Sequence, residues 1–199
     1  MTVAFVVGNG MSRKDIELYP LKNYGKVYAC NALFRHFDPH YLVAVDVKMI
    51  LEINHSKYQM NNEVWTNPNK QYSGMQGFNF FQPAKGWSSG PTALWLASTH
   101  VHDTIYILGF DFHGTKDDLG NRTKVNNLYA GTHNYKKVGE PATYFGNWER
   151  QTASTCDAHQ GKKYIRIVAD NDDFVPKQLK KCTNLSHITV SEFKRYYDF

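Results

Sequence analysis

Apolar and polar positions along the chain form blocks that predict alternating strands and helices. Helical patterns start at Val47, Ser89 and Asn147, and Ser191 is expected to cap a final short helix. Short apolar runs, rich in β-branched and aromatic residues, predict strands at 3–7, 26–30, 41–45, 64–66, 78–81, 104–108 and 164–169. Alternation of this kind predicts an α/β, Rossmann-like fold with a mainly parallel sheet flanked by helices.

The helix that starts at Ser89 has the clearest apolar stripe. Ala93, Leu96, Ala97 and Val101 recur at helical spacing, so we expect all four to be buried. Ser89 is expected to cap this helix, because serine accepts hydrogen bonds from free N–H groups at helix starts. Ser12 is expected to cap a helix after the first strand in the same way.

Residues 113–145 are rich in Gly, Asn, Lys and Tyr and show no periodicity. A stretch this long without regular structure is, in a compact domain, usually a lid or an active-site loop. We therefore expect a single nucleotide-binding α/β domain at 1–199, with a lid-like loop at 113–145 inside it.

Glycines and polar residues follow the predicted strands at the points where these strands end. Because the carboxyl ends of parallel strands meet at one edge of a sheet, the residues that follow them are expected around one crevice. These residues are 8–12, Asn31, Asp46, 88–90 and 110–113.

The first strand is followed by a glycine turn that contains Gly8, Asn9, Gly10 and Ser12. Glycines let backbone N–H groups approach a phosphate, and a helix start adds a favourable dipole. The turn lacks the third glycine of the dinucleotide fingerprint and the lysine of a P-loop, so it favours neither an NAD enzyme nor an ATPase. It predicts a nucleotide site, and the alternative is a plain turn from strand to helix.

The remaining candidates for nucleotide binding follow later elements. Asn31 can donate and accept hydrogen bonds at once, which suits a ribose hydroxyl or a pyrimidine edge. Ser88, Ser89 and Gly90 open a helix and are candidates for binding an anion or a base. Asp111 is a candidate for holding a sugar hydroxyl. The structural alternatives are a turn asparagine, a helix cap and a loop-stabilising aspartate.

The composition adds a mild positive charge and many aromatic residues. Lys and Arg number 23 against 18 Asp and Glu, which gives a formal net charge of +5. A positive excess suits anionic ligands such as nucleotides, whereas the lack of a long basic run argues against a nucleic-acid partner. Aromatic residues make up 15% of the chain, a density that supplies both cores and binding surfaces.

Other features concern the cellular setting. No run of 18 apolar residues occurs, so no membrane span is expected, and the first residues are typical of a strand rather than a signal peptide. Cys30, Cys156 and Cys182 are odd in number and widely spaced, which favours a reducing, cytoplasmic setting. No metal-ligand pattern stands out, so no metal cofactor is expected.

Four short motifs recur in order between residues 8 and 112. They are Gly-Asn-Gly-x-Ser at 8–12, Cys-Asn at 30–31, Ser-Ser-Gly at 88–90 and Gly-x-Asp-Phe at 109–112. Their order and spacing resemble those of the bacterial lipooligosaccharide sialyltransferases. The resemblance implies a metal-independent glycosyltransferase that uses a CMP-sugar. It also implies that the asparagines and the serine-glycine helix start hold the cytidine monophosphate.

The resemblance leaves the catalytic base to be chosen among the histidines of this chain. The family has a tyrosine where this chain has His113, and a histidine shortly before the helix after the lid, where residues 141–146 contain none. His133 is the nearest histidine. We expect direct displacement with His133 as the proton acceptor and His113 as the second choice. Lys136 or Arg150 is expected to neutralise the leaving phosphate.

Two other functions are alternatives. The lack of the family's histidine fits a non-catalytic protein that binds or sequesters a nucleotide. The glycine turn also resembles, more weakly, that of archaeal-type hydroxymethylpterin pyrophosphokinase-like proteins, which implies a metal-dependent nucleotide phosphotransferase. The sequence names neither the sugar nor the acceptor, nor the oligomeric state.

Overall fold

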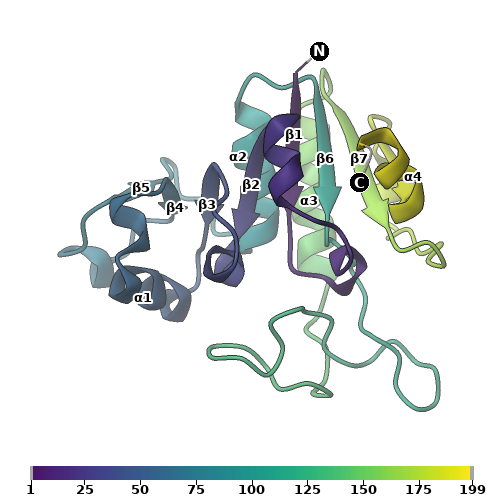
Figure 1. Cartoon of the computed structure of the whole chain (residues 1–199), viewed down its shortest axis with the longest axis horizontal. Helices are drawn as coiled ribbons and strands as arrows, with labels where there is room; N and C mark the ends of the chain where they lie inside the picture. Colours follow the sequence, from purple (N-terminus) through teal and green to yellow (C-terminus); the bar gives the residue numbers. More distant parts are fainter. Residues whose placement is uncertain (1, 198–199) are drawn as a thin grey trace.

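Eight parallel strands form one sheet in the computed structural model, which describes residues 2–197 (Figure 1). The strands are β1 (Val3–Val7), β2 (Lys26–Cys30), β3 (Tyr41–Val43), β4 (Val64–Thr66), β5 (Phe78–Phe80), β6 (Thr104–Leu108), β7 (Lys163–Val168) and β8 (Leu185–Thr189). Their order across the sheet is β5-β4-β3-β2-β1-β6-β7-β8, and each neighbouring pair is parallel. The predicted α/β, Rossmann-like class is confirmed.

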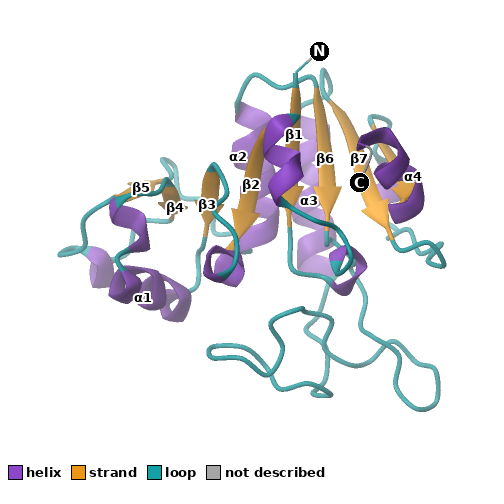
Figure 2. Ribbon diagram, in the orientation of Figure 1, coloured by secondary structure: helices purple, strands orange, loops and turns teal. Residues whose placement is uncertain are grey.

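Helices cover both faces of this sheet, and the central strand β1 shows how. The helices are α1 (Val47–Ser56), α2 (Ser89–Thr99), α3 (Gly146–Ala158) and α4 (Val190–Tyr197). Phe5 and Val7 pack in one apolar layer with buried residues of α1 and α4, whereas Ala4 and Val6 pack in a second layer with α2 and α3. Alternate side chains of a strand point to opposite faces, so β1 is apolar throughout. Figure 2 shows α2 and α3 behind the strands.

The chain direction reverses once within the sheet. Strands β1 to β5 extend outward in one direction, and α2 then returns the chain to β6, which pairs with the other side of β1. The gap between the carboxyl ends of β1 and β6 is therefore the switch point at which ligands bind in doubly wound sheets.

One prediction about packing is wrong, and one strand has no prediction. Val101 is 89% exposed, because α2 ends at Thr99 and the apolar stripe does not continue beyond it. The edge strand β8 was not predicted, because its residues are half-buried and do not alternate clearly between apolar and polar. The other strands and helices lie within a few residues of their predicted bounds.

The predicted caps also differ from the structure. Ser12 lies within a short 3-10 helix, Met11–Arg13, instead of preceding a helix. Ser88 occupies the N-cap position of α2, and the Ser89 hydroxyl accepts a hydrogen bond from a distant backbone N–H group. Ser191 lies inside α4, where Asp170 accepts its backbone and hydroxyl hydrogens. Each serine thus has a tertiary partner that local sequence does not reveal.

Residues 113–145 form no helix or strand and extend below the carboxyl edge of the sheet (Figure 1). The middle of the segment is fastened to the turn after β1. The Leu128 N–H group donates to the Asn9 carbonyl at 2.8 Å, and the Met11 N–H group donates to Asn126 Oδ1 at 2.8 Å. Tyr129 is buried beside this turn. If the segment moves as a lid, the residues before and after this anchor are the ones that move, while the anchor stays in place.

The length of the helices and the state of the cysteines can be compared with the expectations from the sequence. Within residues 2–197, no helix is both long enough and apolar enough to cross a membrane. Cys30, Cys156 and Cys182 are all buried and form no disulfide. Burial raises the pKa of the Cys30 thiol to about 12, so this thiol is protonated at neutral pH.

Candidate functional site

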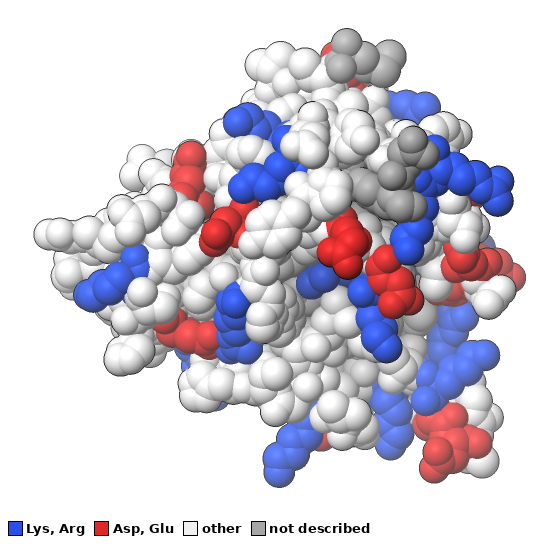
Figure 3. All heavy atoms as spheres, in the orientation of Figure 1, with Lys and Arg blue, Asp and Glu red and all other residues white. Residues whose placement is uncertain are grey.

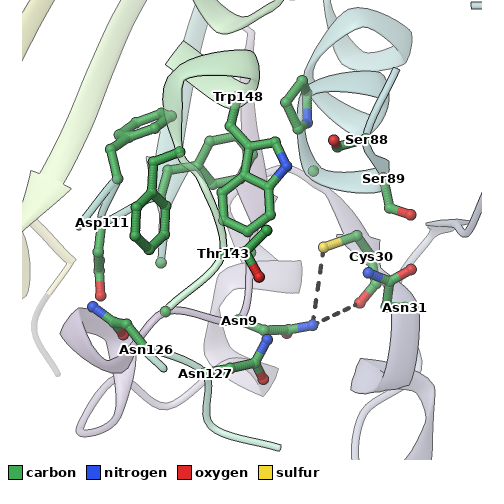
Figure 4. A pocket seen from close by; sticks show the side chains of 18 of the residues that line it. Asn9, Cys30, Asn31, Ser88, Ser89, Asp111, Asn126, Asn127, Thr143 and Trp148 are labelled. Carbon is green, nitrogen blue, oxygen red and sulfur yellow. Dashed lines mark hydrogen bonds between the residues drawn. The ribbon is translucent and has the colours of Figure 1, made fainter. Parts of the chain in front are cut away.

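A cavity of about 440 Å³ opens at the switch point beyond β1 and β6 (Figure 4). Eight of the nine residues predicted to bind a nucleotide line it, namely Gly8, Asn9, Gly10, Asn31, Ser88, Ser89, Gly90 and Asp111. Ser12, the ninth, lies outside the wall and hydrogen-bonds to Asp111. Four segments that are distant in sequence thus meet where the topology predicts a ligand.

The glycine turn after β1 is packed tightly against the loop after β6. The Gly8 N–H group donates to the Leu108 carbonyl at 2.8 Å, and the Gly10 N–H group donates to the Gly109 carbonyl at 2.9 Å. A Cβ atom at Gly10 would lie 2.5 Å from Asp111 Oδ2 and 2.7 Å from the Gly109 oxygen. The glycines are therefore required for loop packing, and these two N–H groups are not available to a phosphate.

Asn9 is buried and held at both ends of its amide. Arg13 Nη2 donates to Asn9 Oδ1 at 3.1 Å, and Asn9 Nδ2 donates to the Cys30 carbonyl at 3.2 Å (Figure 4). The same arginine donates to the Gly8 carbonyl at 2.5 Å. Asn9 therefore links the turn after β1 to the end of β2. Its second amide hydrogen points to the Cys30 sulfur, with Nδ2 and Sγ 4.0 Å apart.

Asn31 is the least satisfied of the polar groups in the cavity wall. Its Oδ1 atom is buried and has no hydrogen-bond partner among the described residues. Its backbone has φ of 55°, a left-handed conformation that asparagine tolerates better than most residues. Because a buried acceptor without a partner is costly, this side chain is suited to accept a hydrogen from a bound molecule.

The first turn of α2 supplies N–H groups to the cavity. The first N–H groups of a helix have no partner inside the helix, and the helix dipole makes this end favourable for anions. Ser89 and Gly90 provide these groups and line the cavity, and the Ser89 hydroxyl accepts a hydrogen bond from the Val45 N–H group at 3.1 Å. An anionic group of a ligand is better placed here than at the glycine turn.

Aromatic rings form much of the remaining wall. Phe110 and Phe112 follow β6, with ring centroids 6.0 Å apart, and Phe145 and Trp148 lie at the start of α3, 5.2 Å apart. The Trp148 indole lies across the cavity from Asn9 (Figure 4). Such faces suit the stacking of a planar or sugar ring.

Several wall residues were not predicted from the sequence. They are Asn126, Asn127, Thr143, Phe145 and Trp148, all in or directly after the segment 113–145. No periodicity marks them, because their positions depend on how the loop folds against the carboxyl edge of the sheet. The adjacent pair of asparagine amides, inside the predicted lid, is the one signal that could have found two of them.

Two carboxylates reach the cavity, and their surroundings differ. Asp111 is 8% exposed and accepts hydrogen bonds from the Ser12 hydroxyl and N–H group. Asp46 follows β3 and has no protein hydrogen-bond partner for its side chain among residues 2–197. The surrounding protein raises the pKa of Asp46 above its usual range. The Asp111 carboxylate is thus held by hydrogen bonds from Ser12, whereas the Asp46 carboxylate makes no hydrogen bond to the described residues.

The two histidines predicted to act as bases lie outside the wall. The His113 ring is bonded at both nitrogens, to Asp172 Oδ2 at 2.5 Å and to the Gly114 carbonyl at 2.9 Å. The His133 side chain is exposed, and its carbonyl accepts a hydrogen bond from Arg35 at 2.9 Å. No histidine lines the cavity. A catalytic role for either histidine stays a prediction that would require movement of the loop.

The predicted cations also lie outside the wall. Lys136 Nζ donates to the Pro141 carbonyl at 3.0 Å, and Arg150 donates to Asn147. Basic side chains do gather over the lower part of the molecule, where the segment 113–145 lies (Figure 3). That segment carries five Lys and Arg against three Asp and Glu. None of these Lys and Arg residues lines the cavity.

Within the described part of the chain, no three His, Cys, Asp or Glu side chains are grouped to hold a metal ion. Comparison with models of known families, with curated proteins and with solved structures found no match. The interpretation of the site therefore rests on its own geometry. A switch-point cavity with amide groups, a helix start and aromatic walls is typical of sites for small organic ligands.

Proposed function

We propose that the protein is a glycosyltransferase that moves a sugar from a nucleotide-activated donor of the CMP-sugar type to a hydroxyl acceptor. One observation carries the proposal. Eight residues chosen from sequence motifs as nucleotide-binding come together in the wall of one switch-point cavity. The resemblance to sialyltransferases, stated from the same motifs, supports the choice of a CMP-sugar.

The polar groups of the cavity match the parts of such a donor. Asn31 Oδ1 has no hydrogen-bond donor among the described residues, and it would accept a hydrogen bond from the exocyclic amine of cytosine or from a ribose hydroxyl. The rings of Phe110 and Trp148 offer faces for the base or the sugar. The N–H groups of Ser89 and Gly90 would bind the phosphate and stabilise its charge as it leaves.

The segment 113–145 would act as a lid in this reaction. The segment carries five Lys and Arg, and closure would bring a cation such as Lys136 toward the departing phosphate. The anchor at Asn126 and Leu128 would hold the middle of the lid in place during closure.

A second candidate function is binding of a nucleotide without transfer. The observation that favours it is the lack of a histidine in the cavity wall. A protein of this kind would show the same nucleotide selectivity and no turnover. The phosphotransferase alternative would instead need a divalent metal ion for activity.

A thermal-shift series followed by a turnover assay tests the proposal. CMP and CMP-N-acetylneuraminate are expected to stabilise the protein by about 2.7 kcal/mol at one hundred times Kd, and UDP- and GDP-sugars at the same concentrations are expected to stabilise it less. Release of CMP from the CMP-sugar is expected in EDTA as well as in Mg²⁺. No stabilisation by any nucleotide would contradict the site. Binding without CMP release would favour the second candidate, and strict Mg²⁺ dependence would favour the phosphotransferase.

A further inference from the structure

A second cavity adjoins the first and shares part of its wall. It has a volume of about 300 Å³ and lies against the first turn of α1, with Asn134 and Tyr135 of the segment 113–145 on its other side. Asn31 and Asp46 line both cavities. These two side chains therefore stand between two separate spaces, each large enough for a small organic group.

The two cavities differ in chemistry. The first has the helix start of α2, amide groups and aromatic rings, which suit a nucleotide. The second has no phenylalanine or tryptophan in its wall, and its side chains include the amide of Asn134, the phenol of Tyr135 and the ammonium of Lys48. Hydrogen-bonding groups of this kind suit a polar molecule with several hydroxyls.

Asp46 is the free carboxylate at this junction. It occupies the N-cap position of α1 but makes no side-chain hydrogen bond there. In contrast, Asp111 is bonded to Ser12, and Asp172 is bonded to His113 and Arg122. A carboxylate that neither caps its helix nor pairs with a cation is available to a molecule in either cavity.

We propose that Asp46 is the proton acceptor of the transfer reaction and that the second cavity holds the acceptor molecule. The inference rests on the proposed glycosyltransferase function. The role of base then passes from His133 and His113 to Asp46, which lies between the donor cavity and the acceptor cavity.

The chemistry at this border balances as a direct displacement. The acceptor hydroxyl oxygen forms a bond to the anomeric carbon of the donor sugar while the bond from that carbon to the phosphate oxygen breaks. The electron pair of the broken bond leaves with the phosphate, toward the N–H groups at the start of α2. The hydroxyl proton passes to a carboxylate oxygen of Asp46 and later to solvent.

The surroundings of Asp46 strengthen it as a base. The groups that face it are the Cys30 thiol from β2, the Tyr72 phenol, and, in the second cavity, Lys48 and Tyr135. Burial raises the pKa of Cys30, Tyr72 and Tyr135, so all three are uncharged at neutral pH. Burial also raises the pKa of Asp46, which favours its taking up a proton.

The test compares Asp46→Asn with the matched change Asp157→Asn, on the exposed side of α3. CMP affinity is measured by calorimetry, and turnover is measured as CMP release from CMP-N-acetylneuraminate, with water or methyl β-galactoside as the acceptor. We expect Asp46→Asn to lower turnover by about 10²–10⁴-fold and to keep CMP affinity within a few-fold. Asp46→Glu should restore part of the turnover, and Asp157→Asn should resemble the wild type.

The pH profile gives a second readout that a structural role would not move. Wild-type kcat/KM should fall in acid as Asp46 is protonated, and the residual activity of Asp46→Asn should lack this acid limb. Turnover of Asp46→Asn close to that of the wild type, with the acid limb kept, would overturn the inference and leave the proposed function intact. CMP binding by the wild type without CMP release would overturn both.

Discussion

Among the described residues, polar side chains are left without protein partners at the carboxyl edge of the sheet, whereas toward the amino edge they are paired with one another. At the carboxyl edge, Asn31 Oδ1 and the Asp46 carboxylate have no hydrogen-bond partner within residues 2–197. Toward the amino edge, where α2 leads into β6, the Tyr28 hydroxyl is bonded to His100 Nδ1 at 2.6 Å and to His102 Nε2 at 2.8 Å. Polar groups that the protein pairs with one another stabilise the fold, whereas those left unpaired beside a cavity are available to a ligand.

Tyr28, His100 and His102 form a paired cluster in which the phenol is buried and the two histidines are half-buried. Tyr28 is fully buried and stacks on Tyr41 with ring centroids 4.5 Å apart. Lys162 Nζ donates to the carbonyls of both His100 and His102 at 2.8 Å. Because a phenol has one hydrogen, one ring nitrogen accepts it and the other must donate to the phenol oxygen. This arrangement requires that the histidine which accepts the phenol hydrogen is uncharged, and it pairs the phenol with protein groups rather than with a ligand.

The largest expected effect is loss of stability in acid. Burial lowers the pKa of His102 to about 4, and burial, aided by Arg166, lowers that of His187 to about 4. The unfolded chain, with histidine pKa values near 6.5, binds more protons than the folded chain between these values. The free energy of unfolding should therefore fall as pH decreases from about 6.5 to about 4. Urea unfolding across this range checks the slope.

Two histidine variants show whether the paired cluster causes this slope. His102→Gln should flatten it, whereas His55→Gln, an exposed change on α1, should leave it as in the wild type. An equal slope in all three proteins would mean that the cluster does not control acid stability.

Removal of the central hydroxyl is the next largest effect. Tyr28→Phe leaves two ring nitrogens of half-buried histidines without their partner and should lower the free energy of unfolding by about 2 kcal/mol. CMP affinity should not change, because Tyr28 is not part of the cavity wall. Chemical denaturation and calorimetry measure the two quantities. Tyr196→Phe, at a ring that is 70% exposed, is the control and should change neither.

The smallest effect is expected at the unpaired edge, where stability and binding should separate. Asn31→Gly removes the amide but keeps the left-handed backbone, so the free energy of unfolding should stay within about 1 kcal/mol of the wild type. CMP binding should weaken by about 1–2 kcal/mol, because the ligand loses its acceptor. Lys57→Gly is the matched control, since Lys57 has φ of 61° at the end of α1. It should leave CMP affinity unchanged.

The opposite result would reverse the comparison between the edges. If Asn31→Gly destabilises the fold and leaves CMP affinity unchanged, Asn31 is a structural residue, like the Tyr28 cluster. Calorimetry and denaturation on the same preparation distinguish the two outcomes.

Much of the fold was predictable because parallel strands that are buried on both faces leave continuous apolar runs. Val3–Val7 and Thr104–Leu108 are of this kind, and both form strands at the centre of the sheet. Once the class of sheet is known, the residues after each strand fall at one edge without any contact information. That rule alone brings Gly8, Asn31 and Asp111 to one cavity.

The remainder depends on contacts that no local pattern contains. Trp148 lines the cavity because the preceding loop brings the start of α3 to the carboxyl edge of the sheet, and its sequence neighbours show no apolar stripe that marks the contact. Ser12 and Ser89 have the composition of helix caps but form tertiary hydrogen bonds to Asp111 and Val45 instead. His113 resembles a candidate base in sequence, yet Asp172, 59 residues further on, holds its ring.

The shared wall of the two cavities couples binding in one cavity to binding in the other. A molecule bound in one cavity and a molecule bound in the other would both contact Asn31 and Asp46. Any change that the first molecule makes in their position or charge changes the affinity for the second. Thermodynamic linkage then requires the second molecule to change the affinity for the first by the same factor. The two sites are thus reciprocal, and titration of either one in the presence of the other measures a single coupling constant.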